Sequence, residues 1–321
     1  RGREALAKMS ASASASSKSK KKAFPEGAFF RKAALEGETT TVTTTTAGEK
    51  GDPLPILSLP CVDIGANLMD EAFEKDVDEV LARAQRAGLK AIVVTGTSLK
   101  ASEKALAFAE TKSQAELEVF ATVGIHPHDA KSCSADGKTM EDLRLLASHP
   151  KCVAIGECGL DFDRNFSPPD VQRTVFEQQV QLAKELGKPL FMHCREAAQD
   201  LEEIIARNRP LGVAGVVHCF TGTMEEMETF VHKLDLHIGI TGWICDDREG
   251  RSAELSLVVK EIPKEKLMIE TDAPYLTPRS IKPNRARPWR NEPCLLPWVM
   301  HKVAQARGET MEDVASATIQ T

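Results

Sequence analysis

Hydrophobic positions along the chain fall into short apolar runs that alternate with longer segments of helical periodicity. This alternation becomes regular from about residue 60 and predicts β-strands followed by α-helices. Eight runs qualify as strands, at residues 61–68, 91–97, 119–127, 152–159, 189–196, 215–222, 236–244 and 267–275. Repeated β-then-α units indicate an α/β fold with a parallel sheet.

The segments between the strands predict helices. The clearest ones span residues 74–88, 171–187 and 223–234, and Gly88 and Gly187 stand where helix C-caps are expected. Eight β-then-α units in about 260 residues match a (β/α)₈ barrel of the TIM type. A doubly wound sheet is the alternative, but it usually has fewer strands and a glycine-rich phosphate loop after the first. The sequence "DIGANL" at that place is not such a loop.

The N-terminal part of the chain differs in composition from the rest. Residues 10–22, "SASASASSKSKKK", and residues 39–46, "TTTVTTTT", cannot bury enough apolar surface to offset their ordering entropy. We therefore expect residues 1–55 to form a low-complexity extension and residues 56–321 to form the barrel domain. The Ser/Ala/Lys-rich start fits either a transit peptide or a plain disordered tail.

Charge is distributed unevenly. The formal net charge of −6 combines +6 from residues 1–22 with −12 from the remainder. An acidic body argues against a general nucleic-acid coat, although a local basic groove remains compatible with it. No apolar run approaches the roughly 18 residues of a membrane helix, so no membrane partner is expected.

Eight cysteines are present, but no pair has the CxxC spacing of a zinc or redox motif. We interpret them as free thiols in a reducing, intracellular compartment, cytoplasmic or nuclear, rather than as a disulfide framework. The N-terminal extension leaves organellar targeting open. The chain is taken as a monomer.

Polar residues stand at the ends of several predicted strands, and in a barrel these ends converge on one mouth. Glu157 follows an apolar run, and a buried, unpaired carboxylate costs several kcal/mol. A cation would balance it. Two carboxylates and two imidazoles suit Mg²⁺, with Mn²⁺ or Zn²⁺ as alternatives, and the expected ligands are Glu157, His193, His218 and Asp272. Taken singly, each residue could instead be an ordinary hydrogen-bonded structural group.

Several ordered segments resemble those of the TatD-related metal-dependent DNases. They are "GIHPHDA", "GECGLDFDRNFS", "QLAKELGKPLFMHCREA", "VVHCFTG", "GITGWI" and "IETDAPYLTP". The resemblance runs from about residue 61 to the C-terminus and implies a (β/α)₈ barrel, a divalent metal and hydrolysis of DNA, commonly as a 3′→5′ exonuclease. By motif it carries metal binding over to the same four residues. It carries His126 over as a residue that faces the substrate phosphate or a second metal.

The first strand departs from the pattern of many relatives. These begin with Asp-x-His-x-His, which supplies two ligands to a second metal, whereas Gly65 and Asn67 occupy those places here. A branch of the family shares Asp-Ile-Gly-x-Asn-Leu. The number of bound ions, one or two, therefore remains open. Asp63 and Asn67 are expected to support the site from behind the ligands.

The expected chemistry is attack of a metal-activated water on phosphorus, with Asp272 accepting the proton and His126 contacting the phosphate or leaving group. Residues 279–291, "RSIKPNRARPWRN", carry five basic residues and no acid. These predict contacts with the phosphates and bases of single-stranded DNA ends, unless the segment is a solvated loop with its Trp packed inward. Substrate-binding candidates are His128, Arg164, Arg195, Arg285, Arg287 and Trp289.

Two other functions compete with a nuclease. One is a barrel metallohydrolase that acts on an aminoacyl-tRNA or a small amide or ester. The other is a non-catalytic nucleic-acid-binding derivative, which the loss of the first-strand histidines would favour.

Overall fold

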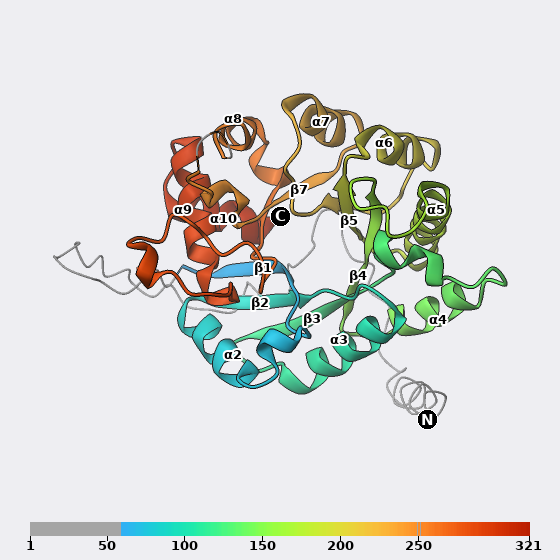
Figure 1. The fold of residues 1–321 in the computed structure, drawn as a ribbon, viewed down its shortest axis with the longest axis horizontal. Helices are drawn as coiled ribbons and strands as arrows, with labels where there is room; N and C mark the ends of the chain where they lie inside the picture. The colour runs from blue at the N-terminus through green and yellow to red at the C-terminus, as the bar shows by residue number, and fades with distance from the viewer. Residues whose placement is uncertain (1–58, 249, 251) are drawn as a thin grey trace.

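A computed structural model describes residues 59–248, 250 and 252–321, so the predicted extension at 1–55 lies outside the described residues. Eight strands form one sheet in the order of the sequence, and all neighbouring pairs are parallel (Figure 1). The strands are β1 Cys61–Ala66, β2 Leu89–Val94, β3 Glu118–Val123, β4 Cys152–Asp161, β5 Leu190–Arg195, β6 Gly215–Val217, β7 His237–Ile240 and β8 Leu267–Ile269.

The two ends of the sheet meet. The Asp272 N–H, just after β8, donates to the Gly65 carbonyl at 2.8 Å, and the Asn67 N–H donates to the Ala273 carbonyl at 2.7 Å. These bonds join β1 to the segment after β8. The barrel prediction is therefore confirmed, and the doubly wound alternative is wrong.

Helices surround the barrel (Figure 1). They are α2 Val77–Arg86, α3 Leu99–Lys112, α4 Lys138–Ala147, α5 Pro169–Leu186, α6 Ala198–Arg207, α7 Met224–Glu228, α8 Ala253–Glu261, α9 Leu296–Arg307 and α10 Met311–Gln320. Helix α5 ends as predicted, because Gly187 adopts the left-handed conformation at φ 63°. No helix among the described residues is long and apolar enough to cross a membrane.

Some predicted boundaries differ from the observed ones. The segment 223–234 is not one regular helix, since α7 ends at Glu228 and the chain continues as a π-helical turn over Thr229–Lys233. Strands β6 and β8 end earlier than predicted. Cys219 and Asp272 have φ angles of 47° and 54°, and this left-handed backbone turns the chain out of the strand direction.

The barrel has a closed end and an open end. Alternate residues of six strands fill its interior with an apolar cluster made of Val62, Ile64, Ala91, Ala154, Phe191, Val216 and Met268. Ile319 of α10 packs against this cluster, and α10 also contacts β1 and β8. Because α10 covers the end where the strands begin, the polar residues at the strand ends lie at the opposite mouth.

All eight cysteines are free and none is paired in a disulfide. This confirms the interpretation of the cysteines as separate thiols. Several are buried beside the strands, where burial raises the pKa of Cys61 and of Cys245 to about 12. Such thiols behave as small apolar groups.

Candidate metal centre

Three imidazoles surround one carboxylate at the mouth of the barrel. Glu157 lies in β4 and is only 6% exposed, while the histidines come from or directly after β3, β5 and β6. The Glu157 Oε1 atom lies 3.3 Å from His126 Nε2, 3.0 Å from His193 Nδ1 and 2.8 Å from His218 Nε2. Residues up to 92 positions apart in sequence therefore meet at a single oxygen atom.

This donor set fits a divalent cation. One ligand atom from each of His126, Glu157 and His193 lies within 4.8 Å of the others, and His218 Nε2 adjoins the same oxygen. Imidazole nitrogens and carboxylate oxygens are ligands that Zn²⁺ and Mn²⁺ accept. The residues present thus suit a metal ion.

Electrostatics tie the carboxylate and the imidazoles together. Burial alone would raise the pKa of Glu157, but the charges of His218 and His126 hold it well below its usual range. Burial would lower the pKa of His218, but the carboxylates of Glu157 and Glu270 raise it well above the ordinary value. A positive charge beside Glu157 therefore stabilises this cluster, whether protons on the imidazoles or a metal ion carry it.

Asp272 lies beside this cluster and interacts with it through charge. Its Oδ1 accepts a hydrogen bond from Asn67 Nδ2 at 2.9 Å. Burial raises the pKa of Asp272 to about 7, with His218 opposing the shift and Glu157 adding to it. The role of Asp272 as a fourth metal ligand remains a prediction. Its side-chain hydrogen bond in the structure is the one from Asn67.

Asp63 fixes the segment that carries Asp272. It is completely buried and accepts hydrogen bonds from the Thr271 N–H at 2.9 Å, the Thr271 hydroxyl at 2.5 Å and the Gly65 N–H at 3.3 Å. Burial raises the pKa of Asp63 to about 7. Asp63 and Asn67 thus both hydrogen-bond to the chain at or next to Asp272, and their support of a metal site remains a prediction.

A second carboxylate lies behind His193. Asp161, the last residue of β4, is buried, and its Oδ2 is 2.7 Å from His128 Nε2 and 3.4 Å from His193 Nε2. Burial opposes ionisation, but His193 and His128 lower the pKa of Asp161 below its ordinary value. His128, expected to contact substrate, is therefore bonded to the protein through Nε2.

Glu270 is a site residue that the sequence reasoning missed. It is completely buried, its Oε1 accepts the Cys219 N–H at 2.5 Å, and its Oε2 lies 3.4 Å from His218 Nδ1. Gly65 makes room for it, because a Cβ at position 65 would overlap Oε2. The signal was present in "IETDAP", where a second acid stands two residues before Asp272.

The basic residues of the mouth divide into paired and unpaired groups. Arg290, one of the five basic residues of the segment 279–291, is buried and bonded to Asp76 at 2.5 Å and Glu292 at 2.9 Å, so the expectation that all five contact phosphates is wrong for this residue. Arg195 pairs with Asp163 at 2.9 Å. Two exposed arginines of the mouth, Arg164 and Arg285, have no carboxylate partner in the described part of the chain. Trp289 is 82% exposed, which excludes inward packing of its ring.

The barrel and its mouth define the class of the protein. Imidazoles and carboxylates gathered at the strand ends of an eight-stranded parallel barrel are the architecture of metal-dependent hydrolases, and the chain is an enzyme of this class. Residues 62–321 match the family model described as TatD related DNase. The chain belongs to this family.

Named relatives agree with the family assignment. The chain is 46% identical over 256 residues to a protein of Erwinia tasmaniensis named 3'-5' ssDNA/RNA exonuclease TatD, covering 80% of this chain and 95% of that protein. It is 44% identical over 256 residues to the protein of the same name from Shigella flexneri, with 80% and 95% covered.

Solved structures show the same fold. A TatD family hydrolase from Entamoeba histolytica superposes with a TM-score of 0.69 at 31% identity, covering 81% of this chain and 95% of that one. A TatD homolog from Escherichia coli k12 superposes with a TM-score of 0.71 at 27% identity, covering 82% and 96%.

Proposed function

We propose that this chain is a divalent-cation-dependent exonuclease that hydrolyses phosphodiester bonds of single-stranded DNA from the 3′ end. The observation that carries the proposal is the convergence of three imidazole nitrogens on Glu157 Oε1, at 2.8–3.3 Å. The names of the relatives extend the proposed substrate to single-stranded RNA. Membership in the TatD related DNase family supports the reaction type.

The contacts behind each histidine assign its tautomer. His218 Nδ1 lies 3.4 Å from Glu270 Oε2 and His193 Nε2 lies 3.4 Å from Asp161 Oδ2, so a ring proton on either nitrogen would face a carboxylate and leave the other nitrogen of the ring for a cation beside Glu157. Carboxylates behind ligand histidines orient the ring and raise its basicity. Glu157, His193 and His218 would therefore hold the cation, with Asp272 as the fourth ligand.

His126 has the opposite arrangement. Its Nδ1 accepts the His128 N–H at 3.1 Å, which places the ring proton on Nε2. A proton on Nε2, which lies 3.3 Å from Glu157 Oε1, leaves no lone pair there for a metal, and the same N–H could donate to a phosphate oxygen or to a leaving group bound beside it. This supports the substrate-facing role for His126 rather than a ligand role.

One resident ion accounts for the donors. Glu270 fills the space beside Gly65, where the second-metal ligands of other relatives are expected. We propose Mg²⁺, with Mn²⁺ or Zn²⁺ as alternatives; the imidazole nitrogens favour the latter two. When bound, the cation supplies a water of lowered pKa and neutralises charge on the phosphoryl group.

Asp272 is the proposed proton acceptor. Burial raises the pKa of Asp272 above its ordinary value in the metal-free protein, which makes this carboxylate a better proton acceptor. Asn67 donates to Oδ1, which fixes the plane of the carboxylate and leaves Oδ2 for the proton. Arg164, with no ion pair among the described residues, is available for a phosphate of the strand.

The cellular setting follows from the thiols. Eight free cysteines fit a reducing compartment, and we propose that the protein acts in the cytoplasm or the nucleus. There it would degrade single-stranded DNA as a monomer, in DNA degradation or DNA repair.

The test uses 5′-labelled single-stranded DNA with purified protein, Mg²⁺ or Mn²⁺, and a parallel reaction in EDTA. We expect a ladder that shortens from the 3′ end only with the cation. Glu157→Ala should abolish it, whereas Glu185→Ala, an exposed carboxylate on α5, should leave it unchanged. Wild-type rates in Glu157→Ala would contradict the site. Retardation without shortening, independent of the cation, would favour a binding protein, and cleavage of an aminoacyl ester with intact DNA would favour the other hydrolase.

A further inference from the structure

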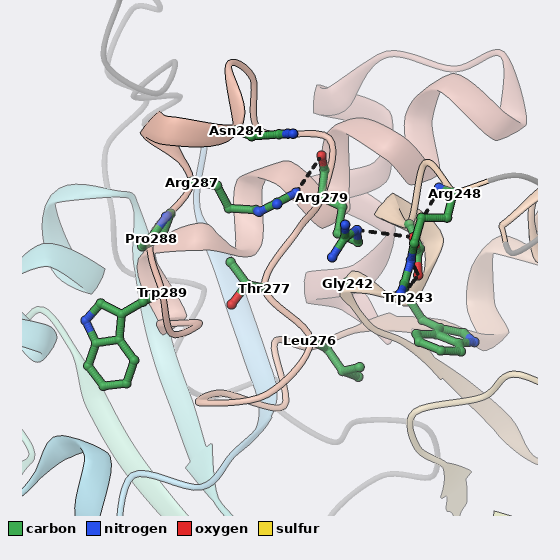
Figure 2. A pocket seen from close by; sticks show the side chains of 11 residues that line it. Gly242, Trp243, Arg248, Leu276, Thr277, Arg279, Asn284, Arg287, Pro288 and Trp289 are labelled. Atoms are coloured by element: carbon green, nitrogen blue, oxygen red, sulfur yellow. Dashed lines mark hydrogen bonds and ion pairs between the residues drawn. The ribbon is translucent and has the colours of Figure 1, made fainter.

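A hollow of about 470 Å³ lies between the loops that follow β7 and β8. Both loops leave the strands at the open mouth, so the hollow is on the same side of the barrel as Glu157. None of the proposed cation ligands lines it. Its main side chains are Trp243, Arg248, Leu276, Arg279, Arg287 and Trp289 (Figure 2).

Positive charge predominates in this hollow. Three arginines line it against one acid, Asp246, which is buried and lies 3.4 Å from Arg279 Nε. Arg248 also pairs with Asp246. Arg287 differs, because no carboxylate of the described chain lies within ion-pair distance of it, and its Nη1 makes only a long contact of 3.5 Å to the Arg279 carbonyl. A half-buried guanidinium without an acid is suited to an anion.

An aromatic ring borders the hollow on one side. In Figure 2, Trp289 lies at one end, Trp243 at the other, and Arg287 and Arg279 lie between them. The Trp289 side chain is 82% exposed, an unusual position for so large an apolar ring. Most of the ring surface is therefore open to a ligand.

The exposed ring of Trp289 has a fixed guanidinium on one side. The Arg290 guanidinium carbon lies 5.4 Å from the centroid of the Trp289 ring and 4.7 Å from the centroid of the Phe73 ring. Arg290 is itself buried and fixed by Asp76 and Glu292. A guanidinium on one side of the ring favours one orientation of it and leaves the rest of its surface open to a ligand.

We propose that this hollow is a subsite for one nucleotide of a single strand, away from the scissile bond, where Trp289 stacks on the base and Arg287 binds the phosphate. The hollow falls within the size range of small-molecule sites. The subsite rests on the proposed function, and it identifies where the part of the strand outside the reacting bond is bound. It takes single strands because a base in a duplex is already stacked and paired.

The experiment measures binding of a fluorescein-labelled hexathymidylate DNA to the full chain in EDTA, by anisotropy, at several salt concentrations. Trp289→Ala should weaken binding by about tenfold or more, as expected for one lost base stack. Arg287→Ala should weaken binding and reduce the slope of log K against log salt by roughly 0.7, the value for one phosphate contact on a single strand.

Two matched variants serve as controls. Leu257→Ala removes a side chain that is 65% exposed on α8, and Arg86→Ala removes an exposed charge at the end of α2 that is remote from the mouth. The subsite would be overturned if Trp289→Ala and Arg287→Ala bound the DNA no more weakly than these controls. An unchanged salt slope in Arg287→Ala would also overturn it. If the wild-type protein binds through these residues but does not shorten the DNA with Mn²⁺, the subsite stands and the proposed hydrolysis fails.

Discussion

The replacement Glu270→Gln tests how the protein prepares His218 for a cation. Glu270 is completely buried, accepts the Cys219 N–H through Oε1 and faces His218 Nδ1 through Oε2. Glutamine has the same shape but only one acceptor oxygen. If that oxygen stays with the Cys219 N–H, the amide NH₂ faces His218 Nδ1. The ring proton must then move to Nε2, which removes the lone pair that the cation needs.

The magnitude can be bounded from the geometry. A cation on His218 Nε2 would lie about 7 Å from Glu270 Oε2, allowing for the ring and a nitrogen–metal bond of about 2.1 Å. At an effective dielectric constant of about 20, the attraction between a divalent cation and this carboxylate is about 5 kcal/mol. This is an upper limit, because the same carboxylate stabilises the protonated ring of His218 in the metal-free protein. Losing a carboxylate behind a ligand histidine typically costs 10- to 100-fold in affinity, or about 1.4–2.7 kcal/mol.

The assay is calorimetric titration of the metal-free protein with Mn²⁺, followed by exonuclease rates at saturating cation. We expect Glu270→Gln to weaken Mn²⁺ binding by about 10- to 100-fold. Glu309→Gln is the control, since Glu309 is a half-buried carboxylate paired with Arg307 at 3.2 Å, outside the site. Wild-type Mn²⁺ affinity in Glu270→Gln would refute the tautomer argument.

Three further results are expected. The pKa of His218 and that of His193 are raised, so a cation that binds these rings must displace protons. The affinity for Mn²⁺ should therefore rise with pH, and calorimetry in buffers of different ionisation enthalpy should detect the released protons. An affinity that does not change with pH would contradict this. Gly65→Ala should lower the free energy of unfolding in urea by about 1–3 kcal/mol because its Cβ overlaps the Glu270 carboxylate, and an unchanged midpoint would show that the carboxylate can move aside. Arg290→Lys should cost about 1–3 kcal/mol in the same assay, since an ammonium cannot make the planar contacts to Asp76 and Glu292, and wild-type stability would show that charge alone suffices.

The fold was predictable because its signal is local and repeated. Each strand is a short apolar run, and each run is followed by a helical segment, so eight repeats sufficed to indicate the barrel. The positions of Glu157, His193 and His218 followed from one further rule, that strand ends converge at one mouth. The structure brings the three side chains together, with His193 Nδ1 and His218 Nε2 at 3.0 and 2.8 Å from Glu157 Oε1, and their binding of a shared cation remains a prediction.

The missed features depend on contacts between distant residues. Glu270 precedes Asp272 by two positions and looks equivalent to it, but only the fold shows that it lies against His218 and fills the space at Gly65. Arg290 looks like its basic neighbours, and its burial depends on Asp76, 214 residues earlier in the chain. No periodicity reports such pairings.

Anomalous scattering from Mn²⁺-soaked crystals tests the central claim most directly. We predict one strong peak at the mouth of the barrel, about 2.0–2.2 Å from ligand atoms of Glu157, His193 and His218. A peak at a different place, or no peak at these three side chains under conditions that support DNA cleavage, would contradict the account.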